Sequence, residues 1–532
     1  MYYQKPKTKK LTKQVLKKRR KSLLRGFFNF SKALHKYIGL ILLLFLAWMS
    51  FSGIFMNHPN AIGDISVDKS IVPGHYHLSN WNRSTLTDAA YIDESTAFFS
   101  GRQGIWKSTD GGRTFADYMD GNFPGSPYWK KTRDIHLDKA NNRLFAATAA
   151  GLFTADINTG DWRKIPAEEK YEDFKKIVDA GGRLLAFSKS HIYELSQVGA
   201  LSEIKTARHE PEPQMSMVDL FFELHGGDAW GLPGKLIYDA AGLITIFLCI
   251  SAFYIWFYPK KLKWFKGKAK KRTSRFKIFY KYHLKLGIWS AFILLIIAGT
   301  GLFMRPPLLV ALVGEHFPMK YYPGIRHDNP WHDKIRNAMY DPVDDEIIID
   351  ATDGYWVGDA SLEGDFRKQE PPIPIFPMGA TVFEVKENGN YLIGSFIGLH
   401  SISRETGRIR DVISSRDTAI SESESVRPGD HMITGYFETH SGERFVTTHN
   451  AGLFPVNAAS AGRFKMPDRI AEEYRMPLWN YMFEIHNARF FEGIIGNWYI
   501  IVVPFGSLLF IILILTGIYD WIFDKIVKRR LK

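Results

Sequence analysis

The chain of 532 residues carries a formal net charge of +14, and 45% of its residues are hydrophobic. Its single cysteine, Cys249, excludes intrachain disulfides and iron–sulfur clusters held by cysteine thiolates. The basic residues concentrate beside apolar stretches, which a membrane surface explains more simply than nucleic acid does, so no nucleic-acid partner is expected.

Four uncharged apolar stretches are long enough to cross a bilayer. They are Tyr37–Met56, Ala240–Tyr258, Leu286–Met304 and Trp498–Tyr519. About 20 residues of helix span the hydrocarbon, and in lipid every peptide group must bond within its own segment. We therefore predict four transmembrane helices. The first is expected to be a retained anchor, because its apolar run exceeds a typical signal peptide and no A-x-A-like cleavage site follows it.

The basic residues set the predicted orientation. About 13 Lys and Arg lie in residues 1–36, about 11 in residues 258–283 and about 5 after Tyr519, and such clusters mark the cytoplasmic side. Both termini are then cytoplasmic and both long intervening segments are exported. In chain order we predict a basic tail (1–34), a first transmembrane helix (35–58), an exported β-rich segment with three blade-like repeats (59–222), a second transmembrane helix with a short preceding helix (223–258), a basic loop (259–281), a third transmembrane helix (282–304), a second exported β-rich segment with three blade-like repeats (305–480), a fourth transmembrane helix with its preceding helix (481–521) and a basic tail (522–532).

The membrane part is duplicated. The first span opens with His35 and the third with His283, and each histidine stands 4 residues before one glycine and 18 before another. Phe222-Glu223-Leu224-His225 precedes the second span, and Phe483-Glu484-Ile485-His486 precedes the fourth. The unit of span, exported segment and span therefore occurs twice in one orientation. Parallel repeats of this kind predict a pseudo-twofold axis along the membrane normal.

This symmetry has a chemical consequence. His35 and His283 would lie at the cytoplasmic ends of two facing helices, and His225 and His486 near the outer ends of the other two. Imidazole is a good ligand of haem iron, and facing helices of a bundle can hold a planar macrocycle. We predict two haem groups, one toward each face, with His58 as a lower-ranked candidate ligand of haem iron. The alternative is that these histidines are ordinary residues of the membrane interface.

The exported segments repeat a weaker pattern of strand, turn, Gly–aromatic step, strand and polar turn. The copies lie about 40 to 55 residues apart, in the range of β-propeller blades. They centre on Gly104-Ile105-Trp106, Gly151-Leu152-Phe153, His191-Ile192-Tyr193, Gly354-Tyr355-Trp356, Gly398-Leu399-His400 and Gly452-Leu453-Phe454. We predict an all-β, propeller-like domain built from the two insertions, either as one six-bladed ring or as two separate β domains. A stretch from Ser108 to Phe115 resembles the Asp-box turn of some propeller blades.

The exported segments offer no assignable catalytic residue. Residues 321–333 gather His, Asp and aromatic side chains that could contact a metal chelate or anchor a loop at the membrane interface. His75 and His77 carry the same two readings. No zinc-protease, Walker, nucleophile-elbow or dinucleotide motif stands at a suitable strand–helix junction.

Three motifs of the spans resemble the PepSY-associated transmembrane helix family. The family's Leu-His-Lys/Arg-x-x-Gly start is similar to Leu34-His35-Lys36-Tyr37-Ile38-Gly39. Its Leu-His-x-Gly element resembles Leu224-His225-Gly226-Gly227, and its Gly-x-Tyr-x-Trp ending resembles Gly517-Ile518-Tyr519-Asp520-Trp521. The resemblance implies a bacterial cytoplasmic (inner) membrane protein with periplasmic exported segments, in which histidines hold b-type haem. Relatives of this kind look like reductases of periplasmic ferric siderophores.

We therefore expect a membrane oxidoreductase that reduces a periplasmic ferric chelate, a ferric siderophore, for iron acquisition. Its partners would be the lipid bilayer, the chelate and an electron donor, either membrane quinol or a cytoplasmic reductase, because the cytoplasmic segments are too short for a flavin or nicotinamide domain. The rival hypothesis is a haem-free, membrane-anchored β-propeller receptor or scaffold. A transporter is disfavoured, since no acid or base lies near the centres of the spans.

Overall fold

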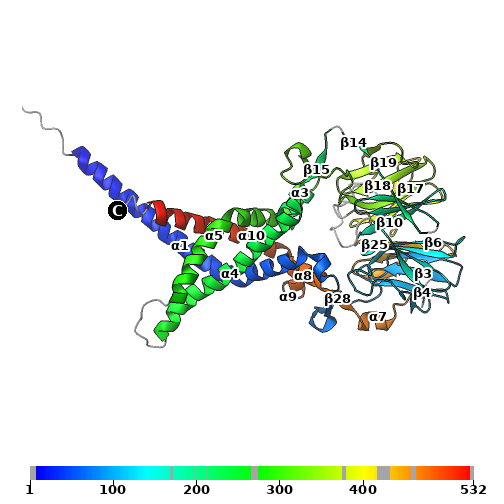
Figure 1. The fold of residues 1–532 in the computed structure, drawn as a ribbon, viewed down its shortest axis with the longest axis horizontal. Helices are drawn as coiled ribbons and strands as arrows, with labels where there is room; N and C mark the ends of the chain where they lie inside the picture. Colours follow the sequence, from blue (N-terminus) through cyan, green and yellow to red (C-terminus); the bar gives the residue numbers. More distant parts are fainter. Residues whose placement is uncertain are drawn as a thin grey trace, which may run out of the picture.

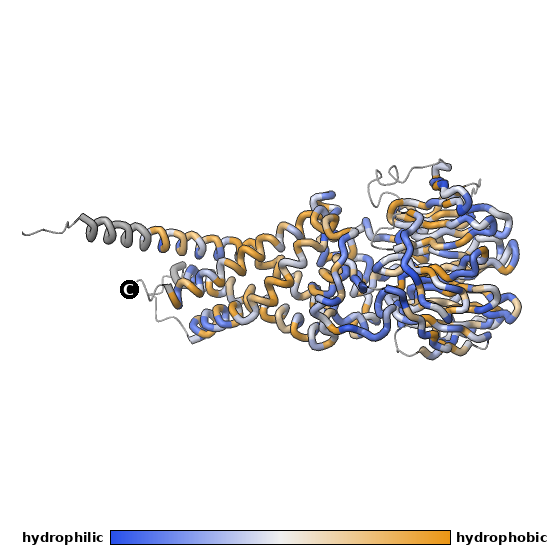
Figure 2. The backbone as a smooth tube through the Cα atoms, turned by 90° about the horizontal axis from the view of Figure 1, so that it is seen from above, coloured by the Kyte–Doolittle hydropathy of each residue, from blue (hydrophilic) through white to orange (hydrophobic). Residues whose placement is uncertain are grey.

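A computed structural model describes residues 8–167, 172–197, 199–210, 212–264, 274–373, 379–415, 432–456 and 463–527. A bundle of long helices occupies one end of the molecule and a β-rich domain the other (Figure 1). Hydrophobic residues run along the helices, whereas the β-rich end has a largely hydrophilic periphery (Figure 2).

Four helices are long and apolar enough to cross a membrane, which confirms the four predicted spans. They are α1 (Thr8–Met56), α4 (Gly231–Trp264), α5 (Ser274–Gly301) and α10 (Tyr499–Ile522). Their ends differ from the predicted ones. Helix α1 continues through residues 8–34, which the sequence placed in a tail, because that stretch contains no proline and only one glycine, Gly26. Helix α5 already begins at Ser274 and ends three residues before the predicted end.

The bundle has the symmetry that the duplication predicts. Helices α1 and α5 each pack against both α4 and α10. Two short helices, α3 (Met217–Gly226) and α8 (Leu478–His486), precede α4 and α10. Helix α3 packs against α5, and α8 packs against α1. Each short helix therefore leans on the first span of the other half.

The β-rich end consists of six antiparallel sheets, three from each exported segment. The first three sheets contain β2 (Asp88–Tyr91), β3 (Ala97–Gly101), β4 (Gly104–Ser108) and β5 (Ala116–Asp117); β6 (Thr132–Asp138), β7 (Arg143–Thr148), β8 (Gly151–Asp156) and β9 (Trp162–Ile165); and β10 (Phe174–Ala180), β11 (Arg183–Ser188), β12 (Ile192–Leu195) and β13 (Leu201–Ile204). The others contain β17 (Ile335–Asp341), β18 (Glu346–Ala351), β19 (Gly354–Asp359) and β20 (Phe366–Gln369), with β14 (Arg208–His209) added in parallel; β21 (Val382–Val385), β22 (Tyr391–Ser395), β23 (Gly398–Ile402) and β24 (Ile409–Asp411); and β25 (Ile433–Glu438), β26 (Arg444–Thr448) and β27 (Gly452–Pro455).

The six sheets close into one ring. Each first strand contacts the first strand of the next sheet, in the order β2, β6, β10, β17, β21 and β25, and β25 contacts β2. The predicted propeller-like fold is therefore confirmed, as a single six-bladed ring and not two separate domains. The third strand of five sheets begins at the glycine of a predicted Gly–aromatic step, and that of the third sheet begins at Ile192.

The start and end of the ring meet in an aromatic core. Trp81, which precedes the first sheet, is fully buried and packs edge-on against Trp106 and Phe115, with ring centroids 5.2 and 5.0 Å away. Its indole N–H donates to the carbonyl of Phe464 at 2.6 Å. Because Phe464 follows the last sheet, this contact joins the first blade to the last.

Two strand pairs connect the propeller to the bundle. Strand β1 (Ser66–Asp68), which follows α1, pairs with β28 (Arg475–Pro477), which precedes α8. Strand β15 (Gln214–Ser216), which precedes α3, pairs with β16 (His316–Pro318), which follows α5. Both pairs therefore link one half of the chain to the other.

Candidate functional site

The structure brings His225 and His486 together at the propeller end of the bundle. Their ring centroids lie 6.2 Å apart and their planes are inclined by 72°. A metal–imidazole bond is about 2 Å long. Two such bonds, plus the distance from each ligating nitrogen to the centroid of its own ring, add up to about the observed spacing of 6.2 Å. The two rings are therefore as far apart as two imidazoles bound to opposite sides of one metal ion.

His225 is fixed by helix α5. Its Nδ1 lies 3.1 Å from the Ile297 carbonyl and 3.1 Å from the Thr300 hydroxyl. A Cβ on Gly301 would lie 3.0 Å from Cε1 of His225, tighter than ordinary contact, so glycine makes room for the ring.

His486, on α8, contacts helix α1 in the same way as His225 contacts α5. Its Nδ1 lies 2.9 Å from the Ser52 hydroxyl, and the Met49 carbonyl is a second partner. Gly53 follows Ser52 and faces Cε1 of His486. Burial lowers the pKa of both His225 and His486, the latter to about 3, so both imidazoles are neutral.

His35 repeats this arrangement at the opposite end of the bundle. Its Nδ1 lies 3.0 Å from the Leu513 carbonyl and 3.2 Å from the Thr516 hydroxyl, both on α10. A Cβ on Gly517 would lie 3.0 Å from Cε1 of His35. Gly53, Gly301 and Gly517, each at the end of a span, thus leave room for the imidazole rings that face them.

His283 completes the set from helix α5. Its Nδ1 lies 2.8 Å from the Ser251 hydroxyl on α4, and the Leu248 carbonyl is again a second partner. His283 and His35 are close enough to interact electrostatically. The structure therefore assembles the four predicted histidines as one pair at each end of the bundle.

The hydrogen bonds fix the tautomer of these rings. A carbonyl oxygen only accepts, so Nδ1 of His35 and of His225 carries the proton. The Ser52 and Thr300 hydroxyls already donate to carbonyls of their own helices, so they accept from Nδ1–H. Within the described part of the chain, Nε2 of all four histidines makes no hydrogen bond. Its lone pair is free to bind a metal, which is the arrangement that metal-ligating histidines show.

Sequence reasoning missed the hydroxyl groups. The four are Ser52, Ser251, Thr300 and Thr516, each three residues after the carbonyl that shares its histidine. A signal was present, because each hydroxyl residue is followed directly by glycine or alanine. Serine and threonine are common in membrane helices, however, so this dipeptide alone indicates no site.

A cavity of about 1730 Å³ lies between the outer histidine pair and the propeller. Many of the residues that the bundle contributes to its walls are apolar, Lys235 and Asp239 being charged exceptions, and both His225 and His486 line it. Arg305 and Asn487 also line it, and Nε and Nη2 of the arginine and Nδ2 of the asparagine are buried without a hydrogen-bond partner in the described structure. The cavity therefore offers apolar walls, two imidazoles and unsatisfied donors that suit carboxylate groups.

His58 lies apart from this arrangement. Its Nε2 is 2.6 Å from a carboxylate oxygen of Asp239 on α4, and Asn57 donates to the same carboxylate at 3.1 Å. The nitrogen that would bind a metal is thus engaged. The carboxylate instead ties the end of α1 to α4.

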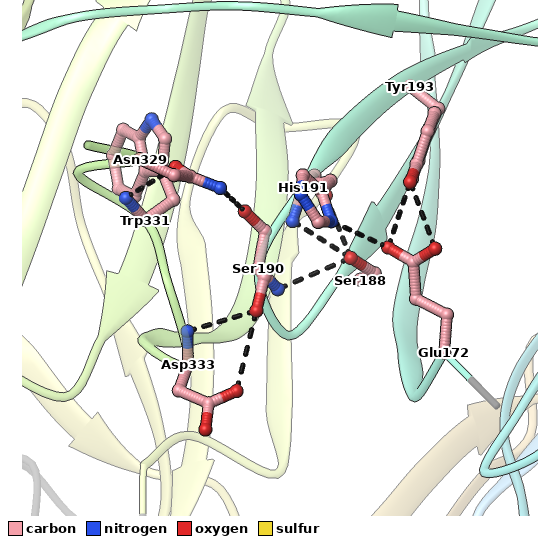
Figure 3. Close-up of polar contacts among 8 residues, drawn as sticks. All are labelled: Glu172, Ser188, Ser190, His191, Tyr193, Asn329, Trp331 and Asp333. Atoms are coloured by element: carbon pink, nitrogen blue, oxygen red, sulfur yellow. Dashed lines mark hydrogen bonds and ion pairs between the residues drawn. The ribbon is translucent and has the colours of Figure 1, made fainter. Parts of the chain in front are cut away.

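The loop of residues 321–333 is tied to the third sheet of the propeller (Figure 3). Asn329 donates to the Ser190 carbonyl at 2.7 Å, and the Asp333 amide donates to the Ser190 hydroxyl at 3.0 Å. Beside this contact, the buried carboxylate of Glu172 accepts from the Tyr193 hydroxyl at 2.9 Å, and His191 Nδ1 lies 2.9 Å from it. The contacts of Ser190 with Asn329 and Asp333 join the two halves of the chain.

The remaining histidines singled out by sequence form no metal centre in the described residues. His327 and His332 line the cavity, but their rings stack face to face at 3.6 Å. Nε2 of His77 lies 3.1 Å from the Val72 carbonyl, and the ring of His75 contacts that of Tyr76 at 4.2 Å, with the two planes tilted by 42°. No group of three or more His, Cys, Asp or Glu in the described ranges could hold a metal ion.

Together these features define a membrane protein whose four spanning helices carry a β-propeller at one end and a histidine pair at each end. The model of the PepSY-associated TM region matches residues 1–258 and again residues 257–523. The chain therefore belongs to the PepSY-associated TM family, and the double match agrees with the internal duplication.

Solved structures with similar folds are remote. The chain is similar to the extracellular domain of the putative one component system BT4673 from B. thetaiotaomicron, with 11% identity, a TM-score of 0.33 and coverage of 73% of this chain and 40% of that chain. It is also similar to YCF48 bound to D1 peptide (8% identity, TM-score 0.36, 73% and 99% covered) and to the WD40 β-propeller domain of Doa1 (10%, 0.33, 75% and 97%). No functionally curated protein matches the chain.

Proposed function

We propose that this protein holds two haem b groups and moves electrons across the bacterial cytoplasmic membrane to a ferric chelate, a ferric siderophore, in the periplasm. The observation that carries this proposal is the repeated histidine site. Four imidazoles have their Nδ1–H bound by a neighbouring helix and Nε2 free, and they form one pair at each end of the bundle. Bound haem would supply one-electron chemistry at each pair.

The residues of the outer site fit the macrocycle. His225 and His486 would ligate its iron, the apolar walls of the cavity would take its ring, and the unsatisfied donors of Arg305 and Asn487 would suit its carboxylates. His35 and His283 would hold the second haem. Reduction of ferric iron weakens its binding by hard oxygen ligands, so delivery of an electron is enough to release the metal.

The proposed orientation puts both termini in the cytoplasm and the propeller in the periplasm, because the basic segments flank the spans at the end opposite the propeller. The electron donor would be membrane quinol or a separate cytoplasmic reductase.

An absorption spectrum of the detergent-purified protein tests the proposal directly. We expect the absorption bands of low-spin b-type haem, which should sharpen when dithionite reduces the haem. Addition of a ferric siderophore should oxidise the haem again and restore the original spectrum. A protein that stays colourless after expression in haem-replete cells and after addition of haem would contradict the proposal. It would favour a haem-free receptor, with the propeller as its binding platform.

The hydroxyl groups give a finer prediction. Ser52→Ala removes the hydrogen bond to His486 Nδ1 without touching the ligating nitrogen, so haem should still bind but about 10- to 100-fold more weakly. A haem titration of the apoprotein measures this change. Ser290→Ala is the matched control, because Ser290 is a buried serine that donates to its own helix (2.8 Å to Leu286). Equal haem affinity in the two variants would show that the hydroxyl does not support the ligand.

A further inference from the structure

Basic side chains gather on the face of the propeller that meets the bundle. They are Arg83, Arg102, Lys131, Arg133, Lys175 and Arg489, called here the mouth cluster. The Arg102 amide donates to the carbonyl of Ser84, next to Arg83, at 2.7 Å, and Arg133 and Lys175 share the carboxylate of Asp173. Arg83 donates to the His75 carbonyl and interacts electrostatically with Glu484, which lies two residues before His486 on α8. Arg489 also lines the cavity of the outer histidine pair. Arg489 is therefore the residue through which the cluster reaches that cavity.

The mouth cluster has few counter-charges. Asp173 accepts from Arg133 at 2.7 and 2.8 Å and lies 2.5 Å from Lys175 Nζ. Glu484 lies 3.6 Å from Arg489 and also accepts from the Tyr76 hydroxyl at 2.8 Å. Both carboxylates are thus engaged.

Three cations of the cluster have no carboxylate partner. Among the described residues, Arg83, Arg102 and Lys131 make no ion pair with an acid. Nε of Arg83 is buried without any hydrogen-bond partner. The cluster therefore has an excess of positive charge that the described protein does not neutralise.

The excess of positive charge disfavours the protonated form of Lys131. The positive charge of Arg133, followed by burial and the charge of Arg102, lowers the pKa of Lys131 well below its usual range. Burial and the neighbouring arginines also lower the pKa of His449 to about 3, so it stays neutral. Enclosed cations without counter-ions destabilise a fold. A bound anion would remove this cost.

We propose that the mouth cluster is the binding site of an anionic metal chelate, one whose ligands are carboxylates or catecholates and leave a net negative charge. The inference rests on the proposed function and narrows it, because it selects polyanionic chelates over neutral and cationic ones. Lys131 and Arg102 attract the chelate, and Arg83 contacts the ring of Tyr76, whose hydroxyl donates to Glu484 on the helix that carries His486. Arg489 borders both the cluster and the cavity of the outer histidine pair.

Binding of gallium(III) citrate to the full chain in detergent tests this site without any redox step. Isothermal titration calorimetry should show about tenfold weaker binding for Lys131→Gln, because a charged partner is lost. Lys131→Arg should bind as the wild type does. The control is Lys139→Gln, since Lys139 lies exposed in the β6–β7 turn of the same sheet and donates only to the Ile92 carbonyl. Without chelate, Lys131→Gln should melt at a higher temperature than the wild type.

Three results would overturn the site: unchanged binding in Lys131→Gln, equally tight binding of gallium desferrioxamine, which is cationic, or equally tight binding of citrate without metal. The two proposals fail in distinguishable ways. A colourless protein that binds gallium citrate through Lys131 would refute the haem proposal alone. A haem protein that does not discriminate between the chelates would refute only the anionic site.

Discussion

If the two proposed haems are present, replacing His486 with alanine is expected to remove the one at the outer pair while the inner one remains. The reason is that His486 would hold the group through Nε2 of a ring held by Ser52, and its loss would leave only His225, whose ring centroid lies 6.2 Å away, at this pair. The reduced haem absorbance per protein should fall to about half that of the wild type, as expected for two equivalent bis-histidine sites. His35→Ala should give the same fall through the inner pair.

These two variants differ in what the remaining haem can do. In His486→Ala the propeller side is without haem, so reoxidation of the reduced protein by a ferric chelate added to that side should be lost. The control is His58→Ala, because the Nε2 of His58 is already engaged by Asp239. A His486→Ala protein with full haem content, or a His58→Ala protein that lacks one haem, would show that the ligands are assigned wrongly.

Trp81→Ala is expected to destabilise the propeller more than any surface change. Trp81 is fully buried, packs against Trp106 and Phe115, and donates to the Phe464 carbonyl that closes the ring. Loss of a buried aromatic side chain costs about 3–5 kcal/mol in the free energy of unfolding. Thermal melting of the full chain, followed by circular dichroism of its β signal, measures the effect.

The matched control is Trp289→Ala. Trp289 lies on α5 with 67% of its surface exposed, so its removal leaves the propeller core intact. We expect its melting temperature to stay near that of the wild type, while Trp81→Ala melts much earlier. Equal melting of both variants would show that the aromatic contact between the first and last blades does not limit the stability of the ring.

The histidine pairs could be predicted because short sequence motifs around the four histidines occur once in each half of the chain. The same spacing from His35 and His283 to their glycines establishes that the two positions are equivalent. The sequence could not show which span His225 and His486 each contact. That follows from the pairs β1–β28 and β15–β16, whose strands lie far apart in the chain and bring α8 to α1 and α3 to α5.

The mouth cluster could not be predicted at all. Arg102 follows β3 and Lys131 precedes β6, so they belong to different sheets, and only the packing of the first sheet against the second sets them beside each other. In the sequence each looks like an ordinary charged residue of a polar turn. The length of α1 was also hidden, because a run of Lys and Arg without proline is equally suited to a tail and to a helix.

The crossed strand pairs bear on how such a chain could arise. Each half consists of two spans and three blades, and it satisfies its strand edges and its histidines mainly through the other half. A single half would leave a propeller open along two edges, and such edges favour association. Two copies of an ancestral half-length chain could therefore have formed this architecture as a symmetric dimer, with each copy lending the two spans on which the other's histidines rest. Fusion of the two genes would then have freed the halves to diverge, and the mouth cluster, drawn largely from the first half, is one result of that freedom.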